Sequence, residues 1–286
     1  MAISIGSNIT SLQAQRRLDG TGQKLSLAFN KLSSGYRINR GADDAAGLAI
    51  AESLKAQSRI ASQAIRNTND GISTIAIADG ALGEVGNILA RLAELASQSA
   101  NGTLSTTQRS VVANEFVALS SEIERIAAVT EFNGIKLLSG SSTITIQVGT
   151  GSGVSSQIGY TNQLATLQGI GLSNNGSGAL TYSINGATDA AAATAARLAL
   201  DAVYAAIYSV GASRGILGGV ESRLSTAITN LGVTRENLVA AESRIRDVDV
   251  AEEAANLTRL NILQQAGTAV LAQANQLPSL ALQLLR

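Results

Sequence analysis

Apolar residues recur at spacings of three and four over most of the chain, a pattern that predicts long α-helices. The longest run covers residues 45–100 and includes Ala61, Ile75, Leu82 and Leu89. At about 1.5 Å per residue, such a helix forms a rod of roughly 80 Å. The chain has one proline, Pro278, so helices are permitted over nearly its whole length. These features predict a mainly α fold of long antiparallel helical rods.

Four further segments carry the same spacing. The first has leucines seven residues apart and ends near Tyr36, where glycines mark turns. Another extends from Val112 to Ile126, between two Asn-Gly pairs. A long one starts near Thr188 and continues past Ile245, and the last occupies the C-terminal end. The seam expected for the long segment consists of Val203, Ile207, Val210, Arg214, Leu217, Glu221, Leu224, Ile228, Leu231, Arg235, Leu238, Glu242 and Ile245.

The two ends of the chain carry matching seams of the coiled-coil type. Residues 1–43 contain six Lys or Arg and two Asp, whereas residues 247–286 contain two Arg and four Asp or Glu. Opposite charge and matching seams predict that the terminal helices pair with each other. Ile262 and Leu271 are expected to lie off the C-terminal seam. The residues expected in the terminal seam are Leu18, Leu25, Phe29, Leu32, Leu260, Leu263, Val270, Ala274 and Leu277.

The middle of the chain has a different composition, rich in Ser, Thr and Gly from about residue 140 to 187. The stretches STITIQVG (142–149) and ALTYSING (179–186) alternate apolar and polar residues, which predicts strands. We therefore expect a terminal-helix domain formed by residues 1–44 and 247–286. The second domain is a helical rod of residues 45–246, which includes the small β region.

Composition excludes several kinds of chemistry. The chain of 286 residues has neither Cys nor His, so thiol catalysis, Ser-His triads and ordinary zinc or haem sites are excluded. Lys plus Arg equals Asp plus Glu, at 21 each, which argues against a nucleic-acid partner. The chain has no run of about 18 or more apolar residues, so we expect no membrane-spanning helix. We expect no cofactor and no catalytic activity.

Three short motifs are candidates for binding or catalytic sites. GTGSG (149–153) follows a strand, but it lacks the lysine of a phosphate-binding loop and is better interpreted as a flexible loop. Asp43 and Asp44 stand where a helix needs a cap and negative charge, and that structural role is favoured over a catalytic one. The acidic segment 247–253 does not match an EF-hand loop and is interpreted as a solvated helix start.

The terminal helices leave apolar positions outside their shared seam, and exposed apolar surface of this kind marks association sites. A heterologous contact that does not close into a ring builds a helical filament. Repeated self-association is therefore the hypothesis that the chain ends favour.

The motifs LSSGYRINRGADDAAGLAIAESL, LAELASQSANGT, EFNGIKLLSG and ILQQAGTAVLAQANQLPSLALQLLR make the chain similar to bacterial flagellin over residues 2–138 and 219–286. The resemblance implies an extracellular structural subunit that polymerises into the hollow flagellar filament used for swimming. The paired terminal helices would line the channel, and the rods would form the surrounding tube.

The resemblance also implies a set of partners. These are the flagellar type III export apparatus, used without a cleaved signal peptide, an export chaperone, the filament cap and the hook-junction proteins. A further implied partner is a host Toll-like receptor, with contacts at Arg91, Leu95 and Glu115. The residues themselves indicate a core position for Leu95 and an ion pair between Arg91 and Glu94.

Two alternative functions compete with that of a filament subunit. A hook–filament junction protein has the same terminal-helix plan, although the C-terminal match and short middle favour flagellin. An enzyme inserted into a flagellin framework would need an H-E-x-x-H helix, which a chain without His lacks.

Overall fold

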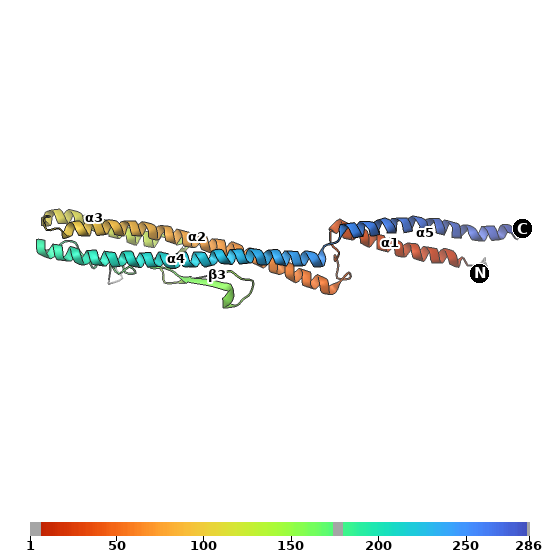
Figure 1. The fold of residues 1–286 in the computed structure, drawn as a ribbon, viewed down its shortest axis with the longest axis horizontal. Coiled ribbons are helices and arrows are strands. Elements are labelled where there is room, and N and C mark those ends of the chain that lie inside the picture. Colours follow the sequence, from red (N-terminus) through yellow and green to blue (C-terminus); the bar gives the residue numbers. More distant parts are fainter. Residues whose placement is uncertain (1–6, 174–179, 285–286) are drawn as a thin grey trace. The chain divides into compact units, whose positions relative to one another are not determined.

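The computed structural model describes residues 7–173 and 180–284, with side chains up to residue 276. Helices account for most of it, as predicted (Figure 1). The long helices are α1 (Ile9–Ser34), α2 (Ala45–Ala100), α3 (Thr106–Val129), α4 (Asp189–Arg246) and α5 (Val250–Leu284). The strands are β1 (Glu131–Phe132), β2 (Ile135–Lys136), β3 (Thr143–Gln147) and β4 (Gln157–Thr161), with a short 3₁₀ turn, η1 (Val154–Ser156), before β4.

The chain divides into two compact units. The terminal unit comprises Met1–Ser58 and Arg235–Arg286, and the central unit comprises Arg59–Thr234. The divisions fall inside α2 and α4, whereas the sequence-based domain boundaries followed the helix ends. The role of each domain in an assembly therefore stays a proposal, and each unit is described by itself below.

The core of the central unit is formed by α2, α3 and α4. The predicted α2 seam is confirmed, because Ile75, Leu82, Val85, Leu89 and Leu92 are all buried. They pack in one hydrophobic cluster with Phe116 and Ile123 of α3 and with buried residues of α4. The spacing of three and four places these side chains on one helix face, and burial of that face holds the helices together.

The seam of α4 differs from the prediction at several positions. The shared residues, among them Val203, Val210, Leu217 and Leu224, are buried as expected. Between them Ala206 and Val220 are buried, Ile207 is half-buried against the same core, and Arg214 and Glu221 are exposed. Arg214 instead lies at the surface, where its Nε is 2.8 Å from Oδ1 of Asp79. The Arg214 guanidinium lowers the pKa of Asp79 below its usual value by hydrogen bonding.

A turn centred on a buried arginine joins α2 to α3. The guanidinium of Arg109 is fully buried and donates hydrogen bonds to three carbonyls, those of Ser99, Asn101 (2.8 Å) and Leu104 (3.2 Å). These carbonyls lie at and beyond the C-terminal end of α2, where backbone acceptors lack helical partners. A capping box between Ser105 and Gln108 starts α3. Arg109 therefore fixes the turn that places α3 beside α2.

The β region is smaller than predicted and is built differently. STITIQVG forms β3 as expected, and β3 pairs antiparallel with β4, with Ile146 opposite Ile158. The expected strand in ALTYSING is wrong for its described residues, 180–186, which form irregular structure. Their alternation still reflects burial, because Ile184 is buried and accepts a hydrogen bond from Ser99 Oγ at 2.7 Å.

The β3–β4 hairpin lies against α2 at a glycine. A Cβ atom added at Gly71 would lie 2.3 Å from Cδ1 of Ile146, so the absence of a side chain permits this close approach. The loop GTGSG belongs to the connection between the two strands, where Gln147 Nε2 donates to the carbonyls of Gly149 (3.1 Å) and Gly151 (2.7 Å). This geometry agrees with a structural loop.

Two helices, α2 and α4, are long and apolar enough to cross a membrane by length and composition alone. Core helices of soluble proteins meet the same criterion, so this is weak evidence for a span. Apolar side chains of both helices are packed in the central core. The expectation of no membrane insertion stays a prediction.

Candidate functional site

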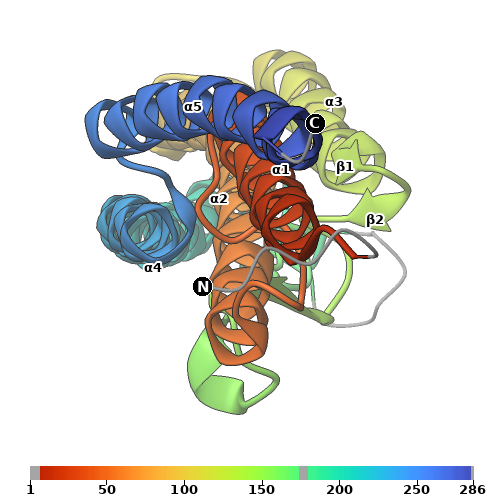
Figure 2. The same cartoon turned by 90° about the vertical axis from the view of Figure 1, so that its right-hand side faces the viewer.

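The terminal helices α1 and α5 pair along their lengths in antiparallel fashion, as predicted (Figures 1 and 2). At one end, Asn8 Nδ2 donates to the carbonyl of Ala274 at 2.9 Å, and Ser11 Oγ is 2.8 Å from Asn275 Oδ1. Farther along, the helices approach closely because Gly267 has no side chain. A Cβ atom there would lie 3.3 Å from Cδ1 of Leu18.

Local sequence sets the limits of both helices. The Asn8 side chain accepts a hydrogen bond from the Ser11 backbone N–H at 3.0 Å and caps the start of α1. Gly35, with a φ of 75°, ends α1 in the left-handed conformation that glycine adopts without strain. The Asp44 carboxylate accepts from Gly47 N–H at 2.9 Å, which confirms a capping role at α2. Asp249 plays the same part for α5, accepting from the N–H of Ala251 at 2.9 Å.

Backbone hydrogen bonds and a charged side chain join the α1–α2 connection to the α4–α5 connection. Arg37 N–H donates to the carbonyl of Arg246 at 2.7 Å, and Val248 N–H donates to that of Gly35 at 3.0 Å. The Arg246 guanidinium lies 4.4 Å from the centre of the Tyr36 ring, a cation–π distance. Its Nη1 is also 3.0 Å from Glu52 Oε1. These contacts fix where α4 ends and α5 begins relative to α1.

The side of α5 that faces α1 differs from the predicted seam. Leu260 and Ala274 are buried as expected. Leu263 and Val270 are 49% and 60% exposed, so their placement in the α1–α5 contact is corrected. Leu260, Gly267 and Ala274 lie seven residues apart and belong to two possible seams, one with Leu263 and Val270 and one with Gln264 and Leu271. The contact with α1 uses the second seam. The positions with restricted exposure on this side of α5 are Glu253, Asn256, Leu257, Leu260, Gln264, Gly267, Leu271 and Ala274.

On α1 the predicted leucines, Leu18, Leu25 and Leu32, are half-buried, and Ser11 and Ala28 are the buried positions. Phe29 is 64% exposed, so it also lies outside the contact within one chain, contrary to prediction. Leu277 was predicted to continue the seam, but its side chain lies outside the described residues. Apart from Leu260, the pair is therefore held by small and half-buried side chains, which bury less apolar area than large buried ones.

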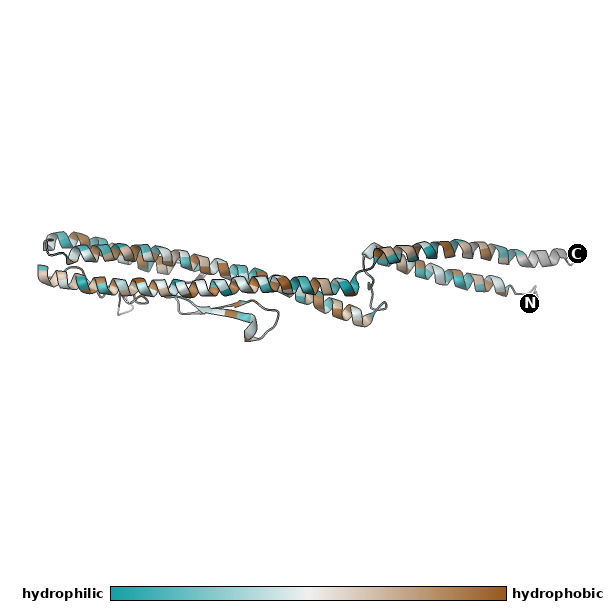
Figure 3. Cartoon of the chain, in the orientation of Figure 1, coloured by the Kyte–Doolittle hydropathy of each residue, from teal (hydrophilic) through white to brown (hydrophobic). Residues whose placement is uncertain are grey.

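Apolar residues recur along both terminal helices (Figure 3), and several of them are exposed. On α5 these include Ile262, Leu263 and Val270, with Ala266 and Ala269 between them, all exposed. The exposed apolar residues of α1 are Ile9, Leu12, Leu27 and Phe29. The opposite side of α5 carries polar residues, among them Asn261, Gln265 and Thr268. We call the exposed set Ile262, Leu263, Ala266, Ala269 and Val270 the α5 stripe.

Charge does not explain the pairing of α1 with α5. Within the described part of the chain, no ion pair joins the two helices. The expectation that opposite charges contribute to pairing inside one chain is therefore not supported by the contacts. Arg16, Arg17, Lys24 and Glu252 are exposed, whereas Lys31 and Glu253 are half-buried.

The residues that the resemblance assigned to a receptor lie in the central unit, on α2 and α3. Arg91 forms the predicted ion pair with Glu94, at 2.9 Å, and a second with Glu115, also at 2.9 Å. The hydrogen bonds that the Arg91 guanidinium donates to the carboxylates of Glu94 and Glu115 raise the pKa of Arg91 above its usual value. Leu95 is only 1% exposed and belongs to the core. Geometry thus brings Arg91 and Glu115 together at the surface and places Leu95 beneath it.

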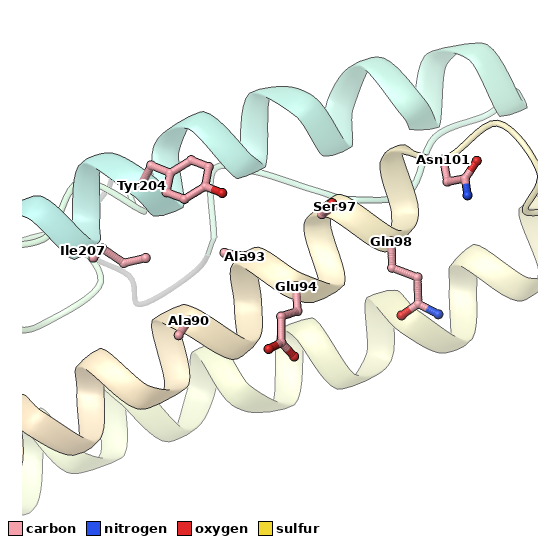
Figure 4. A pocket seen from close by; sticks show the side chains of 8 residues that line it. All are labelled: Ala90, Ala93, Glu94, Ser97, Gln98, Asn101, Tyr204 and Ile207. Carbon is pink, nitrogen blue, oxygen red and sulfur yellow. The ribbon is translucent and has the colours of Figure 1, made fainter.

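An open groove of about 690 Å³ lies beside these residues, between α2 and α4 (Figure 4). Figure 4 shows Tyr204 of α4 on the side that faces α2, whereas the side chains of Glu94 and Gln98 extend from α2 away from α4. The groove combines small residues with polar ones and contains no paired acid and base suited to catalysis. Within the described residues, no group of three or more His, Cys, Asp or Glu is arranged to hold a metal ion. The groove residues are Ala90, Ala93, Glu94, Ser97, Gln98, Asn101, Tyr204 and Ile207.

The fold defines a class of protein: a helical structural protein whose paired terminal helices expose apolar side chains. Family comparison gives the particular kind. The N-terminal helical region of bacterial flagellin matches residues 5–143, and its C-terminal helical region matches residues 200–285. The chain belongs to the bacterial flagellin family.

Similar proteins agree with this assignment over the whole chain. A flagellin of Halalkalibacterium halodurans is 45% identical, covering 99% of each chain, and a flagellin of Bacillus subtilis is 42% identical with the same coverage. A solved structure of a putative flagellar hook-associated protein from Vibrio parahaemolyticus shares the fold. It has a TM-score of 0.58 at 16% identity and covers 72% of this chain and all of that one.

These findings confirm the predicted function. The chain is a structural subunit that polymerises with copies of itself into the flagellar filament outside the cell. Relatives that match the full length are flagellins, so the junction-protein alternative is not favoured.

Proposed function

We propose that the α5 stripe and the exposed apolar residues of α1 form the surface through which neighbouring copies assemble. The observation that carries this proposal is the exposure of Leu263 and Val270 on a helix whose other side already packs on α1. Covering each such side chain removes apolar area from water at roughly 25 cal/mol per Å². Residues 1–44 and 247–286 would then line the filament channel, with residues 45–246 in the surrounding tube.

Weak packing of the terminal pair also supports export before folding. The α1–α5 contact buries small side chains such as Ser11, Ala28 and Ala274, so the pair gains little stability without neighbours. We propose that it becomes fully stable only when neighbouring copies cover the outward stripes. A chain of this kind suits passage in unfolded form through the type III export apparatus with its chaperone, without a cleaved signal peptide. Assembly beneath the cap and onto the hook-junction proteins would follow.

The α5 stripe can be tested with a pair of aspartates. Replacing Leu263 and Val270 together with Asp should block polymerisation, because each neighbouring copy would have to bury an unpaired charge. We expect filament yield below about one hundredth of the wild-type value, measured by sedimentation and negative-stain electron microscopy after seeding.

The chain offers a matched control on the polar side of the same helix. Asn261→Asp with Thr268→Asp introduces the same charge at the same seven-residue separation, on residues that are exposed and not part of the stripe. This control should assemble markedly better than the stripe variant. Normal filaments from the stripe variant would show that the α5 stripe is not buried in the assembly.

We also propose that the surface around Arg91 and Glu115 contacts a host Toll-like receptor. Two exposed side chains held together by an ion pair present a fixed arrangement of charge. Leu95 would act by keeping α2 in place, since its side chain is buried.

Arg91→Ala should weaken receptor binding about tenfold, the effect expected from losing one charge-assisted contact. Binding of monomeric protein to the receptor ectodomain would measure it. Arg125→Ala is the matched control, because Arg125 forms a similar exposed pair with Glu122 on α3. Equal effects of the two substitutions would contradict a specific contact at Arg91.

A further inference from the structure

Charge is distributed unevenly along the α1–α5 pair. The half of the pair that contains the start of α1 carries four cations, Arg16, Arg17, Lys24 and Arg259, and one anion, Asp19. All five are exposed. From residue 254 to 276, α5 has neither Asp nor Glu. We call Arg16, Arg17, Lys24 and Arg259 the basic half of the pair.

The other end of the pair is acidic on α5. Asp247, Asp249, Glu252 and Glu253 fall within seven residues. Asp249 is occupied as a helix cap, whereas Glu252 is exposed and has no ion-pair partner among the described residues. Val250 stands between them and is 62% exposed. This acidic start of α5 therefore combines unpaired negative charge with apolar surface.

Arg16 and Arg17 are too far from the acidic start of α5 to meet it within one chain, although Lys31 of α1 and Arg259 of α5 lie closer to it. Because Tyr36 pairs with Asp247 and the helices are antiparallel, Glu252 lies beside the part of α1 near Lys31. Arg16 is fifteen residues from Lys31 along α1, which corresponds to about 22 Å of helix axis. A neighbouring copy displaced along the axis by about this distance would bring the acidic start of its α5 beside Arg16.

We propose that neighbouring copies in the filament are aligned by this charge pattern, with the basic half of one pair against the acidic start of α5 in the next copy. The inference rests on the proposed role of the terminal pair in assembly. Apolar stripes attract without fixing the axial position of one helix along another, because apolar burial is non-directional. Complementary charge fixes register and suppresses wrong alignments. The contact is heterologous, as an open helical polymer requires.

Cross-linking between copies tests the alignment directly. Gln13→Cys, one turn from Arg16, and Ala255→Cys, one turn from Glu252, are both at exposed positions and leave every charge in place. The natural chain has no cysteine, so a disulfide between the two variants can form only between copies. Mixed filaments under mild oxidation should yield the peptide that links residues 13 and 255, detected by mass spectrometry. The same mixture should not yield it before seeding.

A cross-link between residues 13 and 255 demands Cα atoms within about 7 Å, which makes the test strict. Filaments that form normally without that cross-linked peptide would overturn the proposed alignment. They would leave the assembly role of the α5 stripe intact, because that role is tested separately by Leu263→Asp with Val270→Asp. The cross-link therefore tests the alignment alone, and the aspartate variant tests the α5 stripe alone.

Charge reversal provides the second test. Arg16→Glu and Glu252→Lys should each slow seeded elongation about fivefold at low salt, and the double variant should regain most of the wild-type rate. The difference between variants should shrink as salt increases, since exposed charges are screened. Arg197→Glu on α4, in the central unit, is the control and should lack rescue by Glu252→Lys. A double variant as slow as the two single effects combined would contradict the alignment.

Discussion

Replacing Leu260 with Asp should abolish filament formation. Leu260 is 4% exposed in the contact between α5 and α1, where the α5 backbone approaches Leu18 most closely at nearby Gly267. A carboxylate there would be buried without a partner, at a cost of about 4 kcal/mol or more. Because about 1.4 kcal/mol corresponds to tenfold in an equilibrium constant, the critical concentration for polymerisation should rise by roughly a thousandfold.

The measurement is the concentration of unassembled subunit in equilibrium with seeded filaments, read by sedimentation. Leu260→Met is the matched control, because it nearly conserves volume and apolar character and should cost less than about 1.5 kcal/mol. Unlike the stripe variant, Leu260→Asp acts on the contact inside each chain. A critical concentration within a few-fold of wild type would show that the α1–α5 contact does not support assembly.

Arg109→Met should have the largest effect on the stability of the central unit. The substitution leaves three carbonyls at the end of α2 without the hydrogen bonds that the buried guanidinium donates. Hydrogen bonds from a charged donor contribute about 1.5–3 kcal/mol each, and local water recovers part of that loss. We expect destabilisation of about 3 kcal/mol and a melting temperature lower by roughly 6–12 °C, followed by circular dichroism.

Arg109→Lys separates charge from geometry. A lysine keeps the positive charge but lacks the planar fork that reaches three acceptors at once, so it should recover only part of the lost stability. Melting of Arg109→Met within about 2 °C of wild type would contradict a structural role for the turn. Full recovery by lysine would show that charge, not the shape of the guanidinium, holds the end of α2.

Helical periodicity was informative where a seam is wholly apolar. In α2, the apolar spacing marks a single face, and Ile75, Leu82 and Leu89 are buried as predicted. In α5, both alternations around Leu260 and Gly267 contain apolar residues. The spacing alone offered no reason to prefer Leu271 over Val270, because each would bury a similar apolar side chain. The same ambiguity affects α4, where Ile207 was predicted in the seam but Ala206 is the fully buried residue and Ile207 is half-buried.

The strand predictions failed for a related reason. Alternation in residues 180–186 predicts burial of every second side chain, and Ile184 is indeed buried. Whether that segment forms a strand depends on its lying beside a sheet edge, and β3 pairs instead with β4, at Gln157–Thr161. Pairing between distant segments is a tertiary property that local spacing does not contain.

The sequence by itself determined the helical class, the approximate limits of the long helices, the cap at Asp44, and the family. Each of these depends on short-range spacing, on side chains near their own backbone, or on motifs read directly. Only the tertiary structure decided which apolar side of α5 packs on α1 and which side remains outward. That choice depends on the close approach at Gly267 and on the junction around Arg246, where residues more than two hundred positions apart meet. Since the outward side is the proposed assembly surface, the location of this surface follows from packing and not from sequence spacing.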